Sequence, residues 1–425
     1  MKIGLIYDAA YPWSKGGGEK HLYDLAQQLV LRGHEVHLFC MQYWGGPAEL
    51  CDNGVHYHGL CPRMPLYNAR GKRSITAALS FAWAVLTRLP KRTMRGLDIV
   101  DVNAFPFLSV VTFWIARRLF FPGVPWLVTW LEVWGLQYWR RYLGLPGWAG
   151  AAVELLAARV APAHLCISRL TATRLHKRLG IPCRHVELVP RGLDLPAGFP
   201  RGTPKAPRRV VIVGRLIGYK RVDLIIHAWP EVLGTIPSAE LRITGDGPER
   251  AVLTTLVEAL GLQGSITFLG QLAEHEAVLA EIEKASLLVL PSEREGQGLV
   301  VLEAMALGTA VLVADGVESA ASEFLTTNEQ RRWSLLPWSA DAATWAERIG
   351  QLLGNAELLG RLAAEGKEGA IPYGWHDQVV PRMQRLYQER IAATVNTGRL
   401  PSLGARFRQR GGSRSDRGRA RQSGS

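Results

Sequence analysis

The alternation of short apolar segments with amphipathic helical segments is the feature that most constrains how this chain can fold. Residues 2–7 form an apolar run, residues 19–32 place leucine and alanine at helical spacing, and residues 35–40 form a second apolar run. The same alternation predicts strands near 98–102, 126–130, 164–167, 186–189, 209–213, 240–244, 265–269, 287–290 and 310–313. Strands that alternate with helices pair in parallel, so we predict an α/β fold built on parallel sheets.

The alternation is interrupted once, between residues 191 and 208, where proline and glycine accumulate. A chain of 425 residues is also long enough for two domains. We therefore predict two doubly wound Rossmann-like domains whose strand ends face a central cleft. The predicted divisions are an N-terminal domain (1–190), a linker (191–208), a C-terminal domain (209–374), a helix that crosses back to the first domain (375–395) and a basic tail (396–425).

The tail accounts for much of the positive charge of the chain. From Gly398 onward there are eight arginines and one aspartate, which is +7 of the formal net charge of +13. Such a segment has too little apolar surface to offset the entropy of ordering, so we predict a disordered, solvated tail or a tether to an anionic surface. Nucleic-acid binding is the alternative. No aromatic residues alternate with the arginines to stack on bases, so no specific nucleic-acid partner is expected.

Cysteine usage and apolar segment lengths indicate a cytoplasmic protein. The five cysteines include no Cys-x-x-Cys pair, which suits a reducing compartment. Cys51, His56, His58 and Cys61 match no standard zinc spacing, and two histidines alternating along a strand is the favoured interpretation. No signal peptide is apparent, and the longest uncharged apolar segment, residues 74–87, is shorter than the roughly 18 residues expected of a membrane span.

That apolar segment has basic residues on both sides. Such a layout suits an interfacial helix on an anionic membrane, which predicts peripheral association with the inner face of the membrane and access to lipid-linked acceptors. The favoured alternative is an ordinary scaffold helix, which the strand and helix alternation requires here in any case. The flanking basic residues are Arg70, Lys72, Arg73, Lys91, Arg92 and Arg95.

The segment 291–308 has the layout of a phosphate site. A buried strand is followed by a loop with two glycines, Gly296 and Gly298, and then by a helix that begins near Leu299. Glycines allow the backbone to approach an anion closely, and a helix N-terminus offers unpaired N–H groups. Glu295 and Glu303 lie beside this anion site, where sugar or ribose hydroxyl groups are their natural partners. This interpretation requires Glu303 to remain unburied and to face the groove between the domains.

The segment resembles the group 1 (family 4) retaining glycosyltransferases. The resemblance rests on the eight-residue spacing of Glu295 and Glu303 within Pro-Ser-x-x-Glu-Gly-x-Gly-Leu-Val-x-Leu-Glu-Ala-Met-Ala. It implies the two-domain GT-B fold, a ribose-binding role for Glu303 and a position near the donor sugar for Glu295. It covers roughly residues 1–395, and it is strongest from 210 to 314.

Two further segments resemble the same family. After the predicted strand at 209–213, Gly214, Arg215 and Lys220 precede a helix, and the resemblance gives them a role in binding the donor diphosphate. After the first strand, Gly17 and Gly18 resemble the family's glycine loop near the diphosphate and the acceptor. Glu19 and Glu132 are the predicted acceptor-side residues. The predicted catalytic residues are Glu295, Arg215 and Lys220.

Three positions depart from the family pattern. Leu131 stands where many relatives have a cleft histidine, Arg191 stands in place of the common asparagine of Pro-Asn-Gly, and Gln297 replaces a usual aromatic residue. The first departure bears on the acceptor side of the reaction, and the third bears on the choice of donor sugar.

The resemblance implies transfer of a hexose-type sugar from a UDP- or GDP-sugar to a glycan, lipid-linked or small-molecule acceptor, with retention, in cell-envelope polysaccharide or glycoconjugate synthesis. The chain contains no Asp-x-Asp sequence, so we expect no metal and no cofactor besides the nucleotide sugar as substrate. Two alternatives stay open. One is a nucleotide-sugar-binding scaffold with impaired catalysis, which Leu131 would explain, and the other is a GT-B sugar-nucleotide epimerase.

Overall fold

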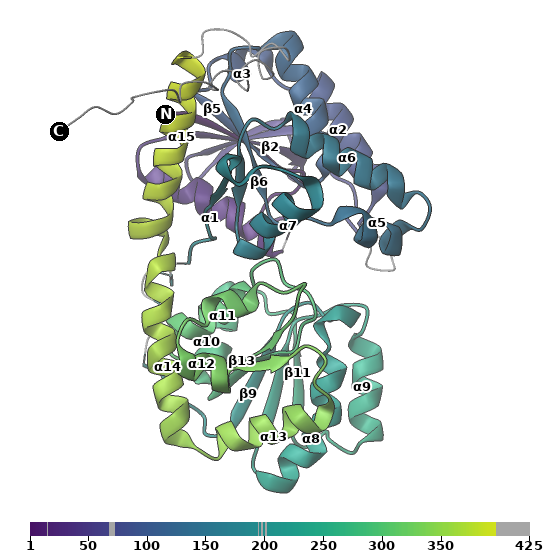
Figure 1. Cartoon of the computed structure of the whole chain (residues 1–425), viewed down its shortest axis with the longest axis vertical. Coiled ribbons are helices and arrows are strands. Elements are labelled where there is room, and N and C mark those ends of the chain that lie inside the picture. Colours follow the sequence, from purple (N-terminus) through teal and green to yellow (C-terminus); the bar gives the residue numbers. More distant parts are fainter. Residues whose placement is uncertain (15, 68–72, 194, 197–198, 200–201, 397–425) are drawn as a thin grey trace, which may run out of the picture.

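The computed structural model forms two α/β domains, one above the other in Figure 1. It describes residues 1–396 except 15, 68–72, 194, 197–198 and 200–201. Of the tail predicted at 396–425, all residues from 397 onward therefore lie outside the described residues, as do Arg70 and Lys72.

The N-terminal domain contains an eight-stranded sheet with the order β3-β4-β2-β1-β5-β6-β7-β8. All neighbouring strands are parallel except β3 and β4. The strands are β1 (Lys2–Ile6), β2 (Glu35–Gln42), β3 (Glu49–Asp52), β4 (Val55–Pro62), β5 (Ile99–Asn103), β6 (Trp126–Trp130), β7 (His164–Cys166) and β8 (Val186–Leu188). The helices are α1 (Gly17–Leu31), α2 (Ile75–Thr87), α3 (Lys91–Arg95), α4 (Phe107–Phe120), α5 (Gly135–Leu143), α6 (Gly147–Val160) and α7 (Arg169–Leu179).

The C-terminal domain contains a six-stranded parallel sheet with the order β11-β10-β9-β12-β13-β14. Its strands are β9 (Arg209–Val213), β10 (Glu240–Thr244), β11 (Ile266–Gly270), β12 (Leu287–Leu290), β13 (Ala310–Asp315) and β14 (Leu335–Pro337). Its helices are α8 (Val222–Thr235), α9 (Arg250–Ala259), α10 (His275–Lys284), α11 (Leu299–Ala306), α12 (Asn328–Trp333), α13 (Ala342–Leu353) and α14 (Ala356–Ala370).

Each sheet has one place where the chain order reverses. In the first sheet the reversal lies between β1 and β5, and in the second it lies between β9 and β12. Ligands of open α/β sheets bind outside the carboxyl ends of the strands at such a reversal. The loops that follow these four strands are therefore the parts of the chain that the fold places for binding.

The predicted architecture of two parallel-sheet domains is confirmed. All eleven predicted strands are present. Most of them are buried apolar runs, such as β12, because a strand covered by helices on both faces has no polar side to reveal it. Two strands were not predicted. β3 pairs antiparallel at the sheet edge with alternating exposure, and β14 has only three residues.

The described residues between β8 and β9 form no helix or strand. The chain returns to the first domain through a π-helical turn, Trp375–Val379, and then α15 (Val380–Asn396). Figure 1 shows α15 lying along the N-terminal domain. The Tyr387 hydroxyl donates to Asp101 Oδ2 at 2.7 Å, and Arg390 Nε donates to the Trp126 carbonyl at 3.2 Å. These buried contacts fix the last helix to the first sheet.

No helix among the described residues is both long enough and apolar enough to cross a lipid bilayer. The predicted apolar segment at 74–87 corresponds to α2, whose first turn is capped by the Ser74 hydroxyl.

Two histidines of the first domain, His164 and His58, are buried. His164 is 2% exposed, and its Nδ1 accepts a hydrogen bond from Trp130 Nε1 at 3.0 Å. Burial, with the nearby His185, lowers the pKa of His164 to about 4. On β4, burial and the neighbouring His37 lower the pKa of His58 to about 4. Each of these groups resists protonation in the folded chain.

We predict that the free energy of unfolding decreases as the pH falls from about 6.5, the pKa of an unfolded histidine, towards 4. In that window the unfolded chain binds a proton at His164 that the folded chain does not, which costs up to about 3 kcal/mol. Burial raises the pKa of Asp101 to about 6, which acts in the opposite direction but equally in every variant.

Urea denaturation of the wild type and of His164→Gln at pH values from about 4.5 to about 7 tests this prediction, because this range extends from inside the window to just above it. The stability of the variant should depend less steeply on pH than that of the wild type. His227→Gln, on an exposed position of α8, is the control and should keep the wild-type slope. Equal slopes for all three proteins would contradict the prediction.

Candidate functional site

The carboxyl ends of β9 and β12 form the C-terminal side of the site. Gly214 and Arg215 follow β9, and Pro291 and Ser292 follow β12. A small pocket between them is lined by these four residues together with Lys220, the last residue of a short 3₁₀ turn before α8. The reversal in strand order thus brings together two of the predicted cations and the start of the predicted phosphate loop.

Lys220 is paired with Glu295. Its Nζ lies 2.5 Å from Glu295 Oε1, and both side chains are largely buried. The backbone of Glu295 is held in turn, because its N–H donates to the Glu318 carbonyl and its own carbonyl accepts from Ala320. The structure therefore joins two predicted catalytic residues that lie 75 positions apart, a pairing that their sequence motifs do not reveal.

The N-terminus of α11 begins at the predicted position. Gly298, its N-cap, has a φ of 77°, and no side chain caps the helix start before Leu299. A Cβ at Gly298 would lie 2.9 Å from the Ala321 Cβ. Gly296 passes the first domain closely, because a Cβ there would lie 3.0 Å from the Leu131 carbonyl oxygen. The start of α11 is thus free of a side-chain cap, and the loop before it lies at a point where both domains meet.

Glu303 differs from the expectation of a residue open to the groove. It is only 7% exposed, and its Oε1 lies 3.3 Å from His275 Nε2. The helix turns it towards the interior, because α11 packs against α10 and α14. Its carboxylate nevertheless lies close enough to Arg191, at the domain junction, to stabilise the charge of that guanidinium. Glu303 therefore faces the junction of the domains from a covered position.

Arg191 is the central cation of this junction, and sequence reasoning identified it only as a departure from a family pattern. Burial lowers its pKa to about 10, and Asp24, Glu303 and Glu19 oppose that effect. Its Nη2 donates to the Gly17 carbonyl, and its backbone N–H donates to Gln297 Oε1 at 3.2 Å. Nε is buried without a hydrogen-bond partner. A lone cation in a linker sequence gives no sign of these contacts.

The glycine loop supplies the N-terminal side of the site. Gly17 begins α1, and Gly18 lies against Tyr7 and Leu131, since a Cβ there would be about 3 Å from both side chains. Glu19 is 6% exposed, and burial raises the pKa of its carboxyl group. Glu19 therefore lies inside the first domain beside the cleft rather than on an open acceptor surface. Leu131, in place of a histidine, gives this part of the cleft an apolar wall.

Glu132 connects the two domains. Its Oε2 accepts from Arg294 Nη2 at 2.5 Å and from Trp134 Nε1 at 3.0 Å. The Arg294 guanidinium lies over the ring of Tyr138, 3.8 Å from its centroid. Arg294 immediately precedes Glu295, so this contact positions the loop between β12 and α11 against α5. The prediction placed Glu132 at the acceptor side but did not identify Arg294.

Two more contacts close the cleft near Arg215. Its guanidinium lies 4.3 Å from the ring centroid of Tyr67, a residue of the first domain. Arg73 lies on the other side of Tyr67, and its Nη2 is 2.6 Å from Asp8 Oδ2. Arg73 precedes α2 as predicted, but its side chain is unavailable to a membrane surface, because the buried Asp8 carboxylate after β1 pairs with it.

No group of three or more metal-ligating side chains occurs among the residues that the structure describes. Cys51, His56, His58 and Cys61 follow the favoured interpretation of a strand: His56 and His58 lie on β4, and His58 contacts His37 instead of a cysteine. All five cysteines are free.

Two sequence models of known families match the chain. "Glycosyltransferase Family 4" matches residues 15–197 and "Glycosyl transferases group 1" matches residues 199–369. Together they span both domains and divide within the predicted linker.

Similar proteins include enzymes with several different acceptors. The chain is 29% identical to a 2-deoxystreptamine N-acetyl-D-glucosaminyltransferase of Streptomyces fradiae, over 84% of this chain and 90% of that protein. It is 30% identical to an exopolysaccharide phosphotransferase of Streptomyces coelicolor, over 65% of this chain and 28% of that protein. It is also 30% identical to a D-inositol 3-phosphate glycosyltransferase of Nocardia farcinica, over 48% of each chain. The chain thus spans less than half the length of the last two relatives.

Two solved structures share the fold at low sequence identity. Sucrose-phosphate synthase from Thermosynechococcus elongatus superposes with a TM-score of 0.72 at 20% identity, over 92% of this chain and 99% of that chain. The Anabaena protein HepE, in complex with UDP-glucose, superposes with a TM-score of 0.65 at 17% identity, over 93% of this chain and 100% of that chain. At these identities, both similarities show that the two-domain fold is shared.

We predict that Gly298→Ala destabilises the C-terminal domain by about 1–2 kcal/mol, because a left-handed backbone conformation is unfavourable for a residue with a Cβ. The contact with Ala321 adds to that cost. Urea denaturation measures the change. Gly360→Ala, at an exposed position inside α14 with open space around it, is the matched control and should be neutral or stabilising by up to about 1 kcal/mol. Equal effects of the two substitutions would refute the strain at Gly298.

Proposed function

Since the chain belongs to the group 1, family 4 glycosyltransferases and has their GT-B fold, we propose that it transfers a hexose-type sugar from a nucleotide-diphosphate sugar, UDP- or GDP-linked, to an acceptor. The acceptor is a glycan, a lipid-linked molecule or a small molecule. The proposed setting is cell-envelope polysaccharide or glycoconjugate synthesis.

The observation that carries the proposal is that Arg215 and Lys220 line one pocket at the reversal between β9 and β12, from which the loop after β12 leads to the uncapped start of α11. A diphosphate leaving group needs preorganised positive charge as the bond to the sugar breaks. Two cations and the uncapped amides from Gly298 onward are proposed to provide it. The proposed reaction therefore needs no metal ion. Glycosyltransferase neighbours that bind UDP and UDP-glucose have the same fold.

Donor binding changes the partner of Lys220. As a diphosphate approaches its Nζ, the Glu295 carboxylate is displaced by a ligand of the same sign and becomes free to accept hydrogen bonds from the donor sugar. The pocket has a volume of only about 10 Å³, whereas ligand sites generally have about 300–1,000 Å³. The cleft must therefore widen for the donor to enter. Glu303 is proposed to bind the ribose once this occurs.

We propose retention of configuration at the transferred sugar. This proposal rests on the resemblance of the segment that holds Glu295 and Glu303 to the retaining family 4 glycosyltransferases. A leaving-group oxygen of the diphosphate is then the proposed acceptor of the proton from the incoming hydroxyl group, on the same face of the sugar.

The acceptor side favours a second candidate function strongly enough to be tested. Leu131 places an apolar side chain against Gly18, where many relatives have a histidine. A chain impaired in this way would bind the nucleotide sugar as a scaffold without turning it over. Release of UDP or GDP from a panel of nucleotide sugars separates the two functions, because only the enzyme consumes the donor.

We also propose that the protein works peripherally on an anionic membrane surface, which gives it access to lipid-linked acceptors. Among the residues suggested as basic flanks of α2, Lys91 and Arg92 are exposed. Arg73 is unavailable for this role because of its buried contact with Asp8. The basic and apolar surface that supports membrane association extends beyond α2 to neighbouring helices.

We predict that Lys220→Ala or Arg215→Ala lowers turnover about 100-fold, as removal of one preorganised donor to a developing negative charge does. The measurement is the initial rate of release of UDP or GDP with a competent donor and acceptor. Lys284→Ala removes an exposed cation at the end of α10 in the same domain and serves as the control.

Thermal shift with UDP and GDP complements the kinetics, because a ligand that binds only the folded chain raises its melting temperature. Lys220→Ala should reduce the shift, and Lys284→Ala should not. Wild-type rates in both cleft variants would overturn the phosphate-binding assignment.

A further inference from the structure

The helices from α2 to α6 form a layer that exposes no acidic side chain. These five helices contain one acidic residue, Glu154, and it is 0% exposed because it accepts hydrogen bonds from the amides of Trp134 and Gly135 at the start of α5. The helices contact one another in the order α2, α4, α6, α5, as Figure 1 shows along one side of the N-terminal domain. Their exposed side chains include Lys91, Arg92, Arg118, Arg140, Arg141 and Arg159.

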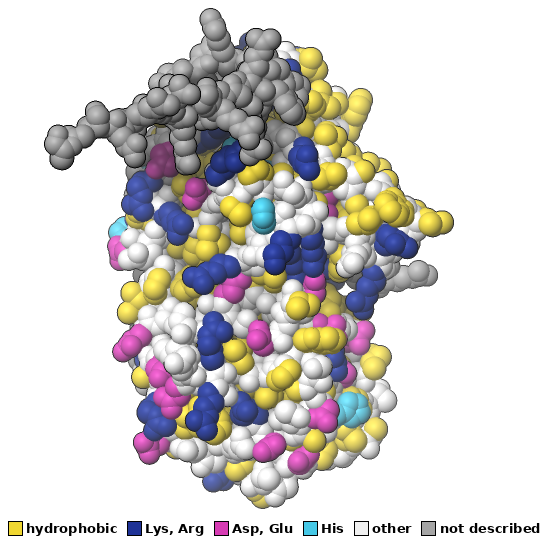
Figure 2. All heavy atoms as spheres, viewed as in Figure 1, with side chains coloured by type: hydrophobic (Ala, Val, Ile, Leu, Met, Phe, Trp, Pro, Cys, Tyr) yellow, Lys and Arg dark blue, Asp and Glu magenta, His cyan; other side chains and the backbone are white. Residues whose placement is uncertain are grey.

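The same layer exposes large apolar side chains. On α2, Ile75, Leu79 and Trp83 are four residues apart and more than half exposed, so they form one outward stripe. At the junction of α5 and α6, Leu145 is 85% exposed and Trp148 is 54% exposed. Figure 2 shows hydrophobic side chains gathered at the upper right, over α2, α4 and α6. Apolar patches of this kind on a folded domain mark interaction surfaces.

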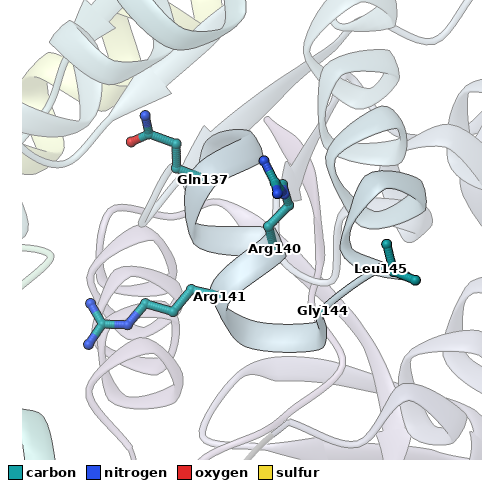
Figure 3. A pocket seen from close by; sticks show the side chains of 5 residues that line it. All are labelled: Gln137, Arg140, Arg141, Gly144 and Leu145. Atoms are coloured by element: carbon teal, nitrogen blue, oxygen red, sulfur yellow. The ribbon is translucent and has the colours of Figure 1, made fainter.

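A depression on α5 brings basic and apolar side chains together. It is lined by Gln137, Arg140, Arg141, Gly144 and Leu145. Figure 3 shows the two arginine side chains extending from successive positions of the helix, with Leu145 beyond its end. The Arg140 guanidinium also lies 5.7 Å from the ring centroid of Trp148. Two guanidinium groups and an amide can bind a phosphate, while Leu145 and Trp148 beside them suit an apolar environment.

Positive charge without negative charge, interleaved with tryptophan and leucine, matches the boundary of an anionic bilayer. Tryptophan and arginine both favour the headgroup level, and basic residues are attracted to the negative leaflet. Nucleic acid would account for the arginines but would leave the apolar stripe of α2 exposed to water. A protein partner would account for the apolar stripe but gives no reason for the exclusion of acidic side chains from five helices.

We propose that the outer face of α2, α4, α5 and α6 docks on an anionic lipid bilayer, with Arg140 and Arg141 binding lipid phosphate and Trp83, Leu145 and Trp148 entering the headgroup region. This docking face rests on the proposed function and deepens it by naming the surface of the protein that meets the membrane. On α5, Tyr138 contacts Arg294 beside Glu295. The helix that binds lipid phosphate thus also borders the reaction centre, where a lipid-linked acceptor would arrive.

Vesicle co-sedimentation of the full chain tests the docking face. The probes are phosphatidylcholine vesicles with and without phosphatidylglycerol, at low and high salt. The test variant is Arg140→Ser/Arg141→Ser, and its matched control is Arg331→Ser/Arg332→Ser, an exposed pair of adjacent arginines on α12 of the other domain. The arginines after residue 397 are common to all proteins in the comparison, so a difference between the two variants does not come from the tail.

We expect the wild type to bind only vesicles that contain phosphatidylglycerol, more weakly at high salt. Loss of Arg140 and Arg141 should raise the vesicle dissociation constant about 30-fold, and loss of the α12 pair should leave it unchanged. At high salt, where charge is screened, Trp83→Ala/Trp148→Ala should bind vesicles more weakly than the wild type does. Trp338→Ala, at an exposed position of the second domain, should bind them as the wild type does.

Equal binding by the α5 and α12 variants, or no binding by the wild type, would overturn the proposal. Concentration-dependent dimers abolished by Trp83→Ala/Trp148→Ala would also overturn it in favour of a second copy of the chain, and so would binding of duplex DNA that vesicles do not compete away. UDP binding is measured separately on the same proteins. GDP binding is measured in the same way, and absence of binding of both nucleotides would contradict the proposed transferase function and leave the vesicle result unaffected.

Discussion

The burial of the Arg191 guanidinium at the junction of the two domains is the constraint on which the arrangement of the site depends. A buried cation is tolerated only if hydrogen bonds and negative charges compensate for its lost hydration. Here the compensation comes from both domains: the Gly17 carbonyl and Glu19 lie in the first, and Glu303 lies in the second. Arg191 therefore fixes the glycine loop relative to α11, and the two reversals in strand order face each other across one cleft.

That arrangement explains why the predicted cations and glycines meet although they come from distant parts of the sequence. Each lies in a loop after a strand that borders a reversal, as Gly17 does after β1 and Lys220 after β9. A parallel sheet places the carboxyl ends of neighbouring strands along one edge. The site is thus assembled by topology, and the chemistry of each loop is already present in its local sequence.

Local sequence predicted the strands and the donor helix because periodicity and glycine position are properties of neighbouring residues. The start of α11 at Leu299 follows from Gly298, whose positive φ suits the N-cap. Ion pairs were not predictable in this way. Lys220 and Glu295 are 75 positions apart, and Arg294 and Glu132 are 162 apart, so neither pair leaves a periodic trace in the sequence.

The burial of Glu303 shows the same limit. Its spacing from Glu295 identified it as a residue of the donor segment, but its exposure depends on α10, which contributes His275. Arg73 is the converse case. Its position beside an apolar helix suggested a surface role, yet the buried Asp8 carboxylate, 65 residues earlier, determines where it lies. In both cases a partner that is distant in sequence outweighs the local pattern.

The contacts between the domains differ in how readily they can be broken, and this difference indicates where the cleft can open. Arg178 and Glu318 are each about one third exposed, and such pairs contribute at most about 1 kcal/mol. At the other side of the molecule, the Tyr387 hydroxyl binds the fully enclosed Asp101 carboxylate, and a hydrogen bond to a charged group contributes about 1.5–3 kcal/mol.

Opening at the Glu318 side breaks its exposed pair with Arg178 together with the pair between Glu318 and Arg174, whose side chain is buried. The chain crosses between the domains at Arg191 and again before Trp375, and the two crossings lie together because the Leu193 amide donates to the Tyr373 carbonyl at 2.8 Å. A rotation about these adjacent crossings would widen the cleft at Lys220 and Glu295 while α15 stays attached to the first domain. The fold thus keeps α15 attached beside its hinge, while the ion pairs of Glu318 with Arg178 and Arg174 close the cleft on the other side.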